Sequence, residues 1–480
     1  MLGQTQRLRR DDQLWVGLAL LAVATLARLQ TFTNPVIGFD EQFYLLVGDR
    51  MWHGALPYVD IFDRKPIGLF LIYAGASRLG ADSFLAYKGV ALLFVTGTAY
   101  LIYRASRPMS SPFAAFMSAT LYILWLNFME GEGGQAEVFF TLPMLAAAVL
   151  VWQAAATNTR ILLRGATAML LVGLALQIKY TAIFEGIFFG VSLLFAQFQT
   201  RPSATALARS GVVWISCALL PTGLAALIYW RSGALDTFMF ANFFSMSGKK
   251  IAPIWSGLAE IIASLAPLLV LAWPTIRNRQ PDILFLKQWA LVAGAAVIGF
   301  GAYGSPHYGI PIIAPLCLLV APRLASQQKR IGHATIGVAL LAFALGQIVL
   351  ARMEYLKGGA TAATAIAQAA TPHRGCIYVY DGYPALYQLT HSCLPTRWAF
   401  PGHLNTQDEA SPRALGVDPV VEVRRILSTK PDIIIDDDPV FEGGNRATHA
   451  LVQAAEARDY ILVLRYRTGF NRYRLVYRRR

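Results

Sequence analysis

The sequence is poor in charged residues. Asp, Glu, Lys and Arg make up 15% of its 480 residues, whereas about 25% is usual in a soluble protein. This shortage argues against a soluble globular protein, and the apolar share of 55% agrees with it. Because about 20 residues cross a bilayer, the sequence predicts a polytopic membrane protein with a further region outside the membrane.

Cysteine and histidine are also scarce, with four Cys and seven His in the chain. They do not cluster at the spacings that metal sites use, so we expect no metal centre and no cofactor. One acidic run, Asp436-Asp437-Asp438, could hold a divalent cation. It follows the end of an expected strand, however, and this position favours a turn.

No internal repeat is visible, and acidic residues such as Glu185 are rare in the apolar stretches. Secondary transporters commonly have inverted repeats and ionisable groups near the membrane centre. Both shortages favour chemistry at the membrane surface over a transporter or flippase, and a lipid or lipid-linked-sugar transporter or flippase is kept as the alternative.

The net charge is +14, which favours a partner that carries phosphate, either a lipid headgroup or a lipid-linked substrate. The basic residues fall in short loops between apolar stretches and not on one soluble face. We therefore expect no nucleic-acid partner.

The apolar stretches predict eleven membrane helices. The first follows Arg7, Arg9 and Arg10 and has no clear cleavage site, so we expect a retained helix with a cytoplasmic N-terminus. The predicted helices lie near residues 14–32, 84–103, 112–129, 138–156, 165–178, 181–199, 210–230, 257–275, 287–304, 308–322 and 333–352.

The positive-inside rule agrees with this count, because every second loop is then basic. Residues 67–79 are too short for a further span, and counting them would invert every later loop. We interpret them as an amphipathic helix at the outer interface, ending at Arg78. The basic loop residues are Arg104 and Arg107, Arg160 and Arg164, Arg201 and Arg209, Arg277, Arg279 and Lys287, and Arg323, Lys329 and Arg330.

This topology predicts a membrane protein with two domains. Residues 1–352 form the transmembrane domain, with 31–83 as its first outer loop, and 353–480 form an outer domain. The loops 130–137 and 231–256 share that outer face.

The C-terminal region reads as a small α/β domain. Strands are expected at 376–380, 432–436, 460–466 and 473–477, and helices at 384–389 and 420–427. Cys376 and Cys393 lie in this region, where an oxidising compartment permits a disulfide without requiring one. Cys217 and Cys317 fall in spans and are expected to pack there.

The first outer loop carries the most informative pattern. Asp40 and Glu41 come directly after the first span, and Asp63-Arg64-Lys65-Pro66 precedes the short apolar segment. Opposite charges are thus expected at one membrane interface.

This loop resembles the signature of GT-C membrane glycosyltransferases, including bacterial aminoarabinose transferases, core galacturonosyltransferases and protein O-mannosyltransferases. Members have an Asp-Glu pair after the first helix and a Phe-Glu-Lys-Pro or Asp-x-Lys-Pro-Pro element some residues later. Ile67 stands here where many members have a second proline. The resemblance implies a mainly α GT-C fold with about eleven transmembrane helices and a small α/β outer domain.

The resemblance also implies a bacterial inner-membrane protein whose outer loop and outer domain are periplasmic, and a polyprenyl-phosphate sugar donor. The residue types suit that chemistry. A carboxylate such as Asp40 can accept the proton of an acceptor hydroxyl, and a cation such as Lys65 can neutralise the leaving phosphate. Direct attack by the hydroxyl would invert the anomeric centre.

Further residues are candidates for the same site, and each has a structural alternative. Asp40 could cap its helix, Glu41 could position its neighbour, and Lys65 could pair with Asp60 or Asp63. Lys179 could snorkel to water, and His307 could be a polar residue at a helix start. The resemblance implies a second acidic site at Glu137, which could instead be an interfacial polar contact, and Arg64, expected near the donor phosphate, could point to lipid headgroups. Lys249 and Lys250 could belong to an ordinary interfacial belt. The candidates near the substrate are Tyr44, Tyr58, Asp63, Lys249, Lys250 and Tyr308.

Three functions remain open from the sequence: a glycosyltransferase, a lipid or lipid-linked-sugar transporter or flippase, and a scaffold whose outer domain binds a partner. For the first, the expected partners are the polyprenyl-phosphate sugar, membrane lipids and an acceptor glycan, lipid or protein. The sequence does not specify the sugar or the acceptor.

Overall fold

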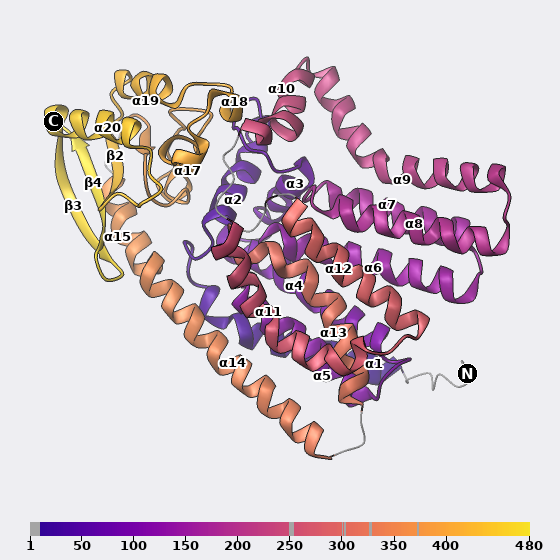
Figure 1. The fold of residues 1–480 in the computed structure, drawn as a ribbon. Helices are drawn as coiled ribbons and strands as arrows, with labels where there is room; N and C mark the ends of the chain where they lie inside the picture. The colour runs from indigo at the N-terminus through magenta and orange to yellow at the C-terminus, as the bar shows by residue number, and fades with distance from the viewer. Residues whose placement is uncertain (1–9, 249–253, 300, 302–303, 326–328, 372–373) are drawn as a thin grey trace. The chain divides into compact units, whose positions relative to one another are not determined.

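The computed structural model describes residues 10–248, 254–299, 301, 304–325, 329–371 and 374–480 (Figure 1). The chain divides into two compact units. The first comprises Met1–Leu29, Lys88–Ala225 and Pro253–Leu350, and the second comprises Gln30–Tyr87, Ala226–Ala252 and Ala351–Arg480.

The first unit is built almost entirely of apolar helices. The boundary with the second unit falls within α4, α9 and α14. The helices are α1 (Arg10–Arg28), α4 (Ser83–Ser106), α5 (Pro112–Trp125), η2 (Leu126–Phe128), α6 (Ala136–Thr157), α7 (Ile161–Leu176), α8 (Ala182–Thr200), α9 (Ala204–Arg231), α11 (Ile254–Ile276), α12 (Pro281–Gly299), η5 (Pro306–Gly309), α13 (Ile310–Leu324) and α14 (Lys329–Lys357).

Among the described residues, nine helices are long and apolar enough to cross a membrane. The sequence predicted eleven, and this count is not confirmed. The difference lies in two shorter apolar helices, Pro112–Phe128 and Ile161–Leu176, which the sequence predicts as spans. Their lengths are at or below the lower limit for a crossing.

Helix α13 is the centre of the first unit, where it packs against α5, α6, α11 and α12. Apart from Arg323 in its last turn it has no charged residue, as expected for a helix surrounded by other helices. Its Cys317 is buried, as predicted, and the Cys317 carbonyl accepts a hydrogen bond from Ser118 on α5 at 2.5 Å.

Local signals in the sequence explain where several helices begin and end. Ser111 caps α5 by accepting a hydrogen bond from the Ala114 amide, with Pro112 at the first helical position. Asn158 ends α6 in the left-handed conformation.

The second unit contains the first predicted outer loop, the loop after α9 and the C-terminal domain. Its first part holds η1 (Leu29–Thr31), α2 (Phe39–Met51) and α3 (Ile67–Ala76), and the loop after α9 holds α10 (Leu235–Met239), η3 (Phe240–Phe244) and η4 (Ser245–Gly248).

Helices α2 and α3 pack closely because Gly48 has no side chain. A Cβ atom at Gly48 would lie 2.6 Å from the Ala74 backbone nitrogen. The predicted short helix at 67–79 is present as α3, but no charged residue lies within its bounds. The prediction of an amphipathic helix is therefore wrong. Arg78 follows the helix and lies over the Trp52 ring.

The C-terminal domain contains a four-stranded mixed sheet in the order β1-β2-β4-β3. β1 pairs parallel with β2, and the other pairs are antiparallel. The strands are β1 (Ile377–Val379), β2 (Ile433–Asp438), β3 (Tyr460–Thr468) and β4 (Arg472–Arg479), and the helices are α15 (Ala360–Ala370), α16 (Leu386–Leu389), α17 (Pro401–Asn405), η6 (Gln407–Glu409), α18 (Pro412–Leu415), α19 (Pro419–Ser428) and α20 (Arg446–Asp459).

All four predicted strands and both predicted helices of this domain are present, so its α/β character is confirmed. The acidic run at 436–438 was expected in a turn, but it lies within β2. The strand continues through these acids because β4 pairs with it residue by residue up to Asp438.

Candidate functional site

The acidic pair of the second unit lies in the first turn of α2. Asp40 and Glu41 follow the N-cap Gly38, which has no side chain to cap the helix. Carboxylates at this end interact favourably with the helix dipole. Glu41 is 1% exposed, and its carboxylate occupies the space that a Cβ atom at Gly38 would need. Glu41 thus folds back over the start of α2, and its predicted role in positioning Asp40 stays a prediction.

The cation follows a tight turn before α3. Tyr58 adopts a left-handed backbone conformation with φ 69°, and its hydroxyl donates to the Lys65 carbonyl at 2.8 Å. The Asp63 carboxylate accepts hydrogen bonds from the Arg64 and Lys65 backbone amides at 2.5 and 3.2 Å. Asp60, the other predicted partner of Lys65, accepts a hydrogen bond from the Leu56 amide at 2.7 Å.

Tyr44 contacts both Asp40 and Lys65. Its hydroxyl donates a hydrogen bond to Asp40 Oδ2 at 3.2 Å, and Lys65 Nζ lies 5.5 Å from the centre of its ring. Burial raises the pKa of the Asp63 carboxyl; the Lys65 ammonium opposes this rise and the Asp40 carboxylate adds to it. Asp40, Asp63, Tyr44 and Lys65 therefore form one charged cluster, named here the loop cluster.

The loop cluster can perform two chemical tasks. Asp40 is half-buried and supplies a carboxylate that can accept a proton. Lys65, also half-buried, supplies a positive charge that can bind an anion such as a phosphate.

Arg64, predicted near the donor phosphate, is held by the C-terminal domain. Its guanidinium forms an ion pair with Glu409 at 2.6 Å, and the two side chains are 9% and 8% exposed. It also donates to the Ala414 carbonyl at 2.8 Å. The sequence did not indicate Glu409 as a partner of Arg64, because no pattern around Glu409 marks it as part of the site.

Aromatic residues extend this contact between the first loop and the C-terminal domain. Phe43 lies 5.2 Å from Phe400 between ring centres, and Phe62 lies 5.2 Å from His403. The Phe62 amide donates to the Arg397 carbonyl at 2.8 Å. Residues 397–414 therefore help to hold the segment that carries the loop cluster.

Four other predicted site residues come together in the first unit. Glu137, in the first turn of α6, forms a buried ion pair with Lys179, which lies between α7 and α8. Lys179 Nζ also lies 3.8 Å from the centre of the Tyr308 ring. Lys179 therefore does not snorkel to water; it is buried with an acidic and an aromatic partner.

His307 is bound to a residue that sequence reasoning did not select. Its Nδ1 lies 3.1 Å from Glu130 Oε2, and its ring packs on that of Tyr308. The loop that carries Glu130 is held from α1, where buried Arg28 donates to the Gly131 and Gly133 carbonyls. The predicted proximity of Glu137 to Asp40 stays a prediction, since the two residues belong to different units.

Two predicted substrate-loop residues, Lys249 and Lys250, lie outside the described residues. Among the residues that are described, no group of three or more His, Cys, Asp or Glu side chains could hold a metal ion. In the acidic run, Asp437 accepts hydrogen bonds from Arg472 and Arg474 of β4.

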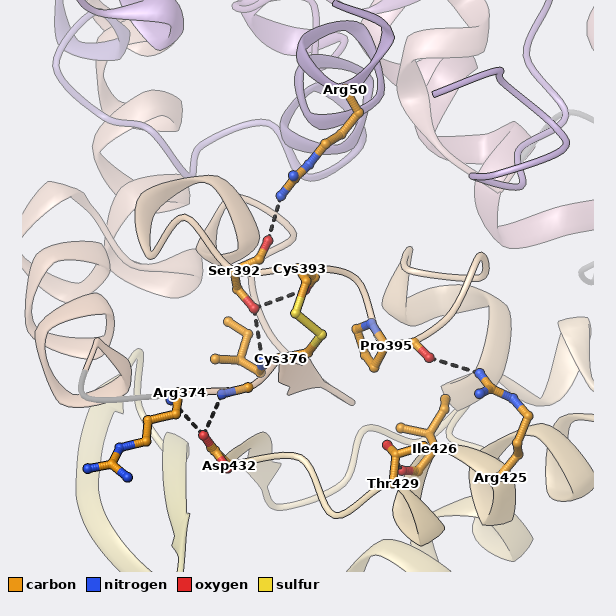
Figure 2. Close-up of a disulfide and its surroundings, with 12 residues drawn as sticks. Arg50, Arg374, Cys376, Ser392, Cys393, Pro395, Arg425, Ile426, Thr429 and Asp432 are labelled. Atoms are coloured by element: carbon orange, nitrogen blue, oxygen red, sulfur yellow. Dashed lines mark hydrogen bonds between the residues drawn. A yellow bond between two sulfur atoms is a disulfide. The ribbon is translucent and has the colours of Figure 1, made fainter. Parts of the chain in front are cut away.

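The disulfide that the sequence left open is present between Cys376 and Cys393, whose Cα atoms lie 4.9 Å apart (Figure 2). Next to it, Ser392 Oγ accepts a hydrogen bond from the Ile377 amide at 2.9 Å, and the Ser392 carbonyl accepts one from Arg50 at the end of α2 (Figure 2). The disulfide thus joins β1 to a loop that contacts α2.

Comparison of the sequence with family models and with curated proteins gives no match. Comparison with solved structures does. The apo structure of ArnT from Cupriavidus metallidurans matches with a TM-score of 0.63 and 15% identity, over 97% of this chain and 98% of that chain. The structure of ArnT bound to undecaprenyl phosphate matches with a TM-score of 0.60 and 14% identity, over 96% and 98%.

A more distant match is the Archaeoglobus fulgidus oligosaccharyltransferase tethered to an acceptor peptide, with a TM-score of 0.53 and 10% identity, over 89% of this chain and 69% of that chain. These matches confirm the predicted GT-C fold. Together with the nine apolar helices found in the described part of the chain, they identify a multi-pass membrane protein.

Proposed function

We propose that this protein is an integral membrane glycosyltransferase that moves a sugar from a polyprenyl-phosphate donor to a hydroxyl acceptor. The observation that carries the proposal is the loop cluster, in which Tyr44 contacts both Asp40 and Lys65. The GT-C fold supports it, since ArnT shares this fold over nearly its whole length and has been solved with undecaprenyl phosphate.

In the proposed reaction, the acceptor hydroxyl attacks the anomeric carbon of the donor. A carbon–oxygen bond forms to the acceptor, the bond to the phosphate oxygen breaks, and the hydroxyl proton passes to Asp40. Lys65 stabilises the negative charge that grows on the leaving polyprenyl phosphate. Because no enzyme nucleophile intervenes, the anomeric centre is inverted.

In this proposal, polar residues of the first unit contribute further contacts to the donor phosphate. The Glu137–Lys179 pair leaves no net charge, so Lys179 can bind a donor phosphate only by exchanging its partner. His307, held by Glu130, is a further candidate for phosphate contact. Glu41 positions Asp40, and Arg64 anchors the first loop to the C-terminal domain.

We place this reaction on the periplasmic side of a bacterial inner membrane, with a cytoplasmic N-terminus and residues 353–480 as the outer domain. The basic loops of the sequence support this orientation. The grouping of residues 30–87, 226–252 and 351–480 in one unit agrees with a shared compartment for these segments.

The test is transfer from a purified polyprenyl-phosphate sugar by the Asp40→Asn variant. Loss of a general base is expected to reduce turnover by at least ~100-fold. Asp49→Asn, in the last turn of the same helix, is the matched control and should keep wild-type turnover. Wild-type turnover by Asp40→Asn would refute the assignment of the base.

A lipid or lipid-linked-sugar flippase is the alternative, and the buried Glu137–Lys179 pair is the observation that favours it, because ionisable groups buried among spans often mark transport paths. Glu185 is also buried, but it accepts a hydrogen bond from Trp289 at 2.6 Å. Lipid flipping by reconstituted protein without any acceptor would support the flippase.

A further inference from the structure

The first unit contains a cavity of about 1100 Å³ between the ends of five helices. Tyr100 and Arg104 line it from the last turns of α4, Trp152 lines it from α6, and Arg323 lines it from α13. The end of α11 and the start of α12 complete its wall.

This cavity is distinct from the polar cluster around Glu137. Glu137 lies in the first turn of α6, and Trp152 lies near the other end of the same helix. At 1.5 Å per residue, these two positions are about 22 Å apart along the helix axis. All five helices that form the cavity belong to the nine candidate spans. The cavity therefore lies where spans end, at the level expected for lipid headgroups.

The lining combines cations with apolar side chains. The guanidinium groups of Arg104 and Arg323 are exposed in the structure. Arg104 donates to the neutral Gln13 side chain at 3.0 Å, so its charge is not neutralised there. Among the lining residues that the structure describes, Asp282 is the one acid, and it accepts a hydrogen bond from Trp152 at 2.6 Å. The wall thus favours an anion attached to an apolar body.

Both arginines lie in the last turn of their helices, where a cation is favoured by the helix dipole. The dipole accounts for their positions but does not account for the open space between them. Pockets of roughly 300–1,000 Å³ are large enough to hold drug-sized ligands. A space of this size can take a headgroup together with the first part of its chains.

We propose that this cavity binds a membrane lipid through its phosphate group, at the end of the helices opposite to Glu137. Arginine suits this ligand because its planar fork binds phosphate oxygens in pairs, and basic pockets between membrane helices are known sites for anionic headgroups. The phosphate belongs either to an anionic phospholipid or to a polyprenyl phosphate. The site is independent of the proposed transferase reaction.

The experiment is native mass spectrometry of the purified full-length chain with added lipids. We expect the wild type to retain phosphatidylglycerol at least tenfold better than zwitterionic phosphatidylcholine. The Arg104→Gln/Arg323→Gln variant should lose this retention by at least tenfold. The matched control, Arg201→Gln/Arg209→Gln, removes the same charge around the α8–α9 connection and should bind like the wild type.

A second variant tests whether loss of binding in the arginine variant comes from misfolding. Ala156→Trp fills the cavity from α6 and keeps both arginines, and it should also lose phosphatidylglycerol. Stronger retention of undecaprenyl phosphate than of phosphatidylglycerol would support the site with a polyprenyl ligand, and the reverse order would support it with a phospholipid. Equal retention by the wild type and both cavity variants would overturn the proposal.

Discussion

The hydroxyl of Tyr44 donates a hydrogen bond to Asp40 Oδ2 at 3.2 Å, one turn earlier on α2. The same ring lies beside the ammonium group of Lys65. Tyr44 therefore contacts both Asp40, the proposed base, and Lys65, the proposed phosphate-binding residue.

Removal of that hydroxyl is expected to impair the reaction without unfolding the protein. A hydrogen bond to a charged group contributes roughly 1.5–3 kcal/mol, so Tyr44→Phe should lower turnover by about tenfold or more. Tyr44→Leu, which also removes the ring beside Lys65, should lower it further. Tyr355→Phe, on an exposed tyrosine, is the control. Equal turnover by Tyr44→Phe and the wild type would show that the hydrogen bond has no part in the reaction.

The Arg64–Glu409 ion pair is expected to stabilise the second unit. Loss of one partner leaves a buried charge alone, so Arg64→Gln or Glu409→Gln should each lower the free energy of unfolding by about 3 kcal/mol. The double variant should lose much less than the sum. Thermal unfolding in detergent measures both effects. Arg458→Gln, which breaks the exposed pair with Asp459, should cause no measurable change.

The disulfide is expected to stabilise the C-terminal domain. It links residues separated by 17 positions, and closing a loop of this length stabilises a protein by about 3 kcal/mol. Cys376→Ser/Cys393→Ser should therefore unfold at a lower temperature than the wild type. Reductant should destabilise the wild type and leave the double variant unchanged. A reductant effect of equal size on both proteins would contradict this assignment.

The stability of the C-terminal domain is expected to fall as pH rises. Burial raises the pKa of Glu456 to about 8, with a smaller contribution from the Asp436 carboxylate. A raised pKa in the folded state means that the folded protein holds the proton more tightly than the unfolded chain. This contribution is complete below the ordinary pKa of a glutamate, and it is lost as pH rises towards 8.

Glu456→Gln removes this pH-dependent loss. The variant should exceed the wild type in stability by on the order of 3 kcal/mol at pH 8, and by very little at pH 4. Unfolding curves across this range measure the difference. A constant difference between the two proteins at all pH values would refute the role of Glu456 ionisation.

The sequence was enough to predict that Asp40 and Lys65 lie near each other, but it did not predict the ion pairs around them. Asp40 and Lys65 flank one short stretch of chain, so a membrane topology was enough to expect them at the same interface. The partner of Arg64 was not predictable, because Glu409 reaches it only through the folding of the distant C-terminal domain. Glu137 and Lys179 were both selected, but their ion pair depends on how α6, α7 and α8 pack.

The unconfirmed and the wrong predictions of the fold have similar causes. The prediction that α5 and α7 cross the membrane is not confirmed, because both helices are apolar but short and composition alone does not distinguish a short buried helix from a span. The acids at the end of β2 suggested a turn because their compensating arginines, Arg472 and Arg474, are on a strand that comes later in the chain. A local sequence pattern does not show ion pairs between residues that lie far apart in the chain.

The most direct test of the central claim is equilibrium binding of undecaprenyl phosphate, the expected product lipid, to Lys65→Met and Asp40→Asn. If Lys65 binds the phosphate and Asp40 takes the proton, Lys65→Met should weaken binding at least ~10-fold, whereas Asp40→Asn should bind normally and fail only in turnover. Wild-type affinity in Lys65→Met would contradict the account.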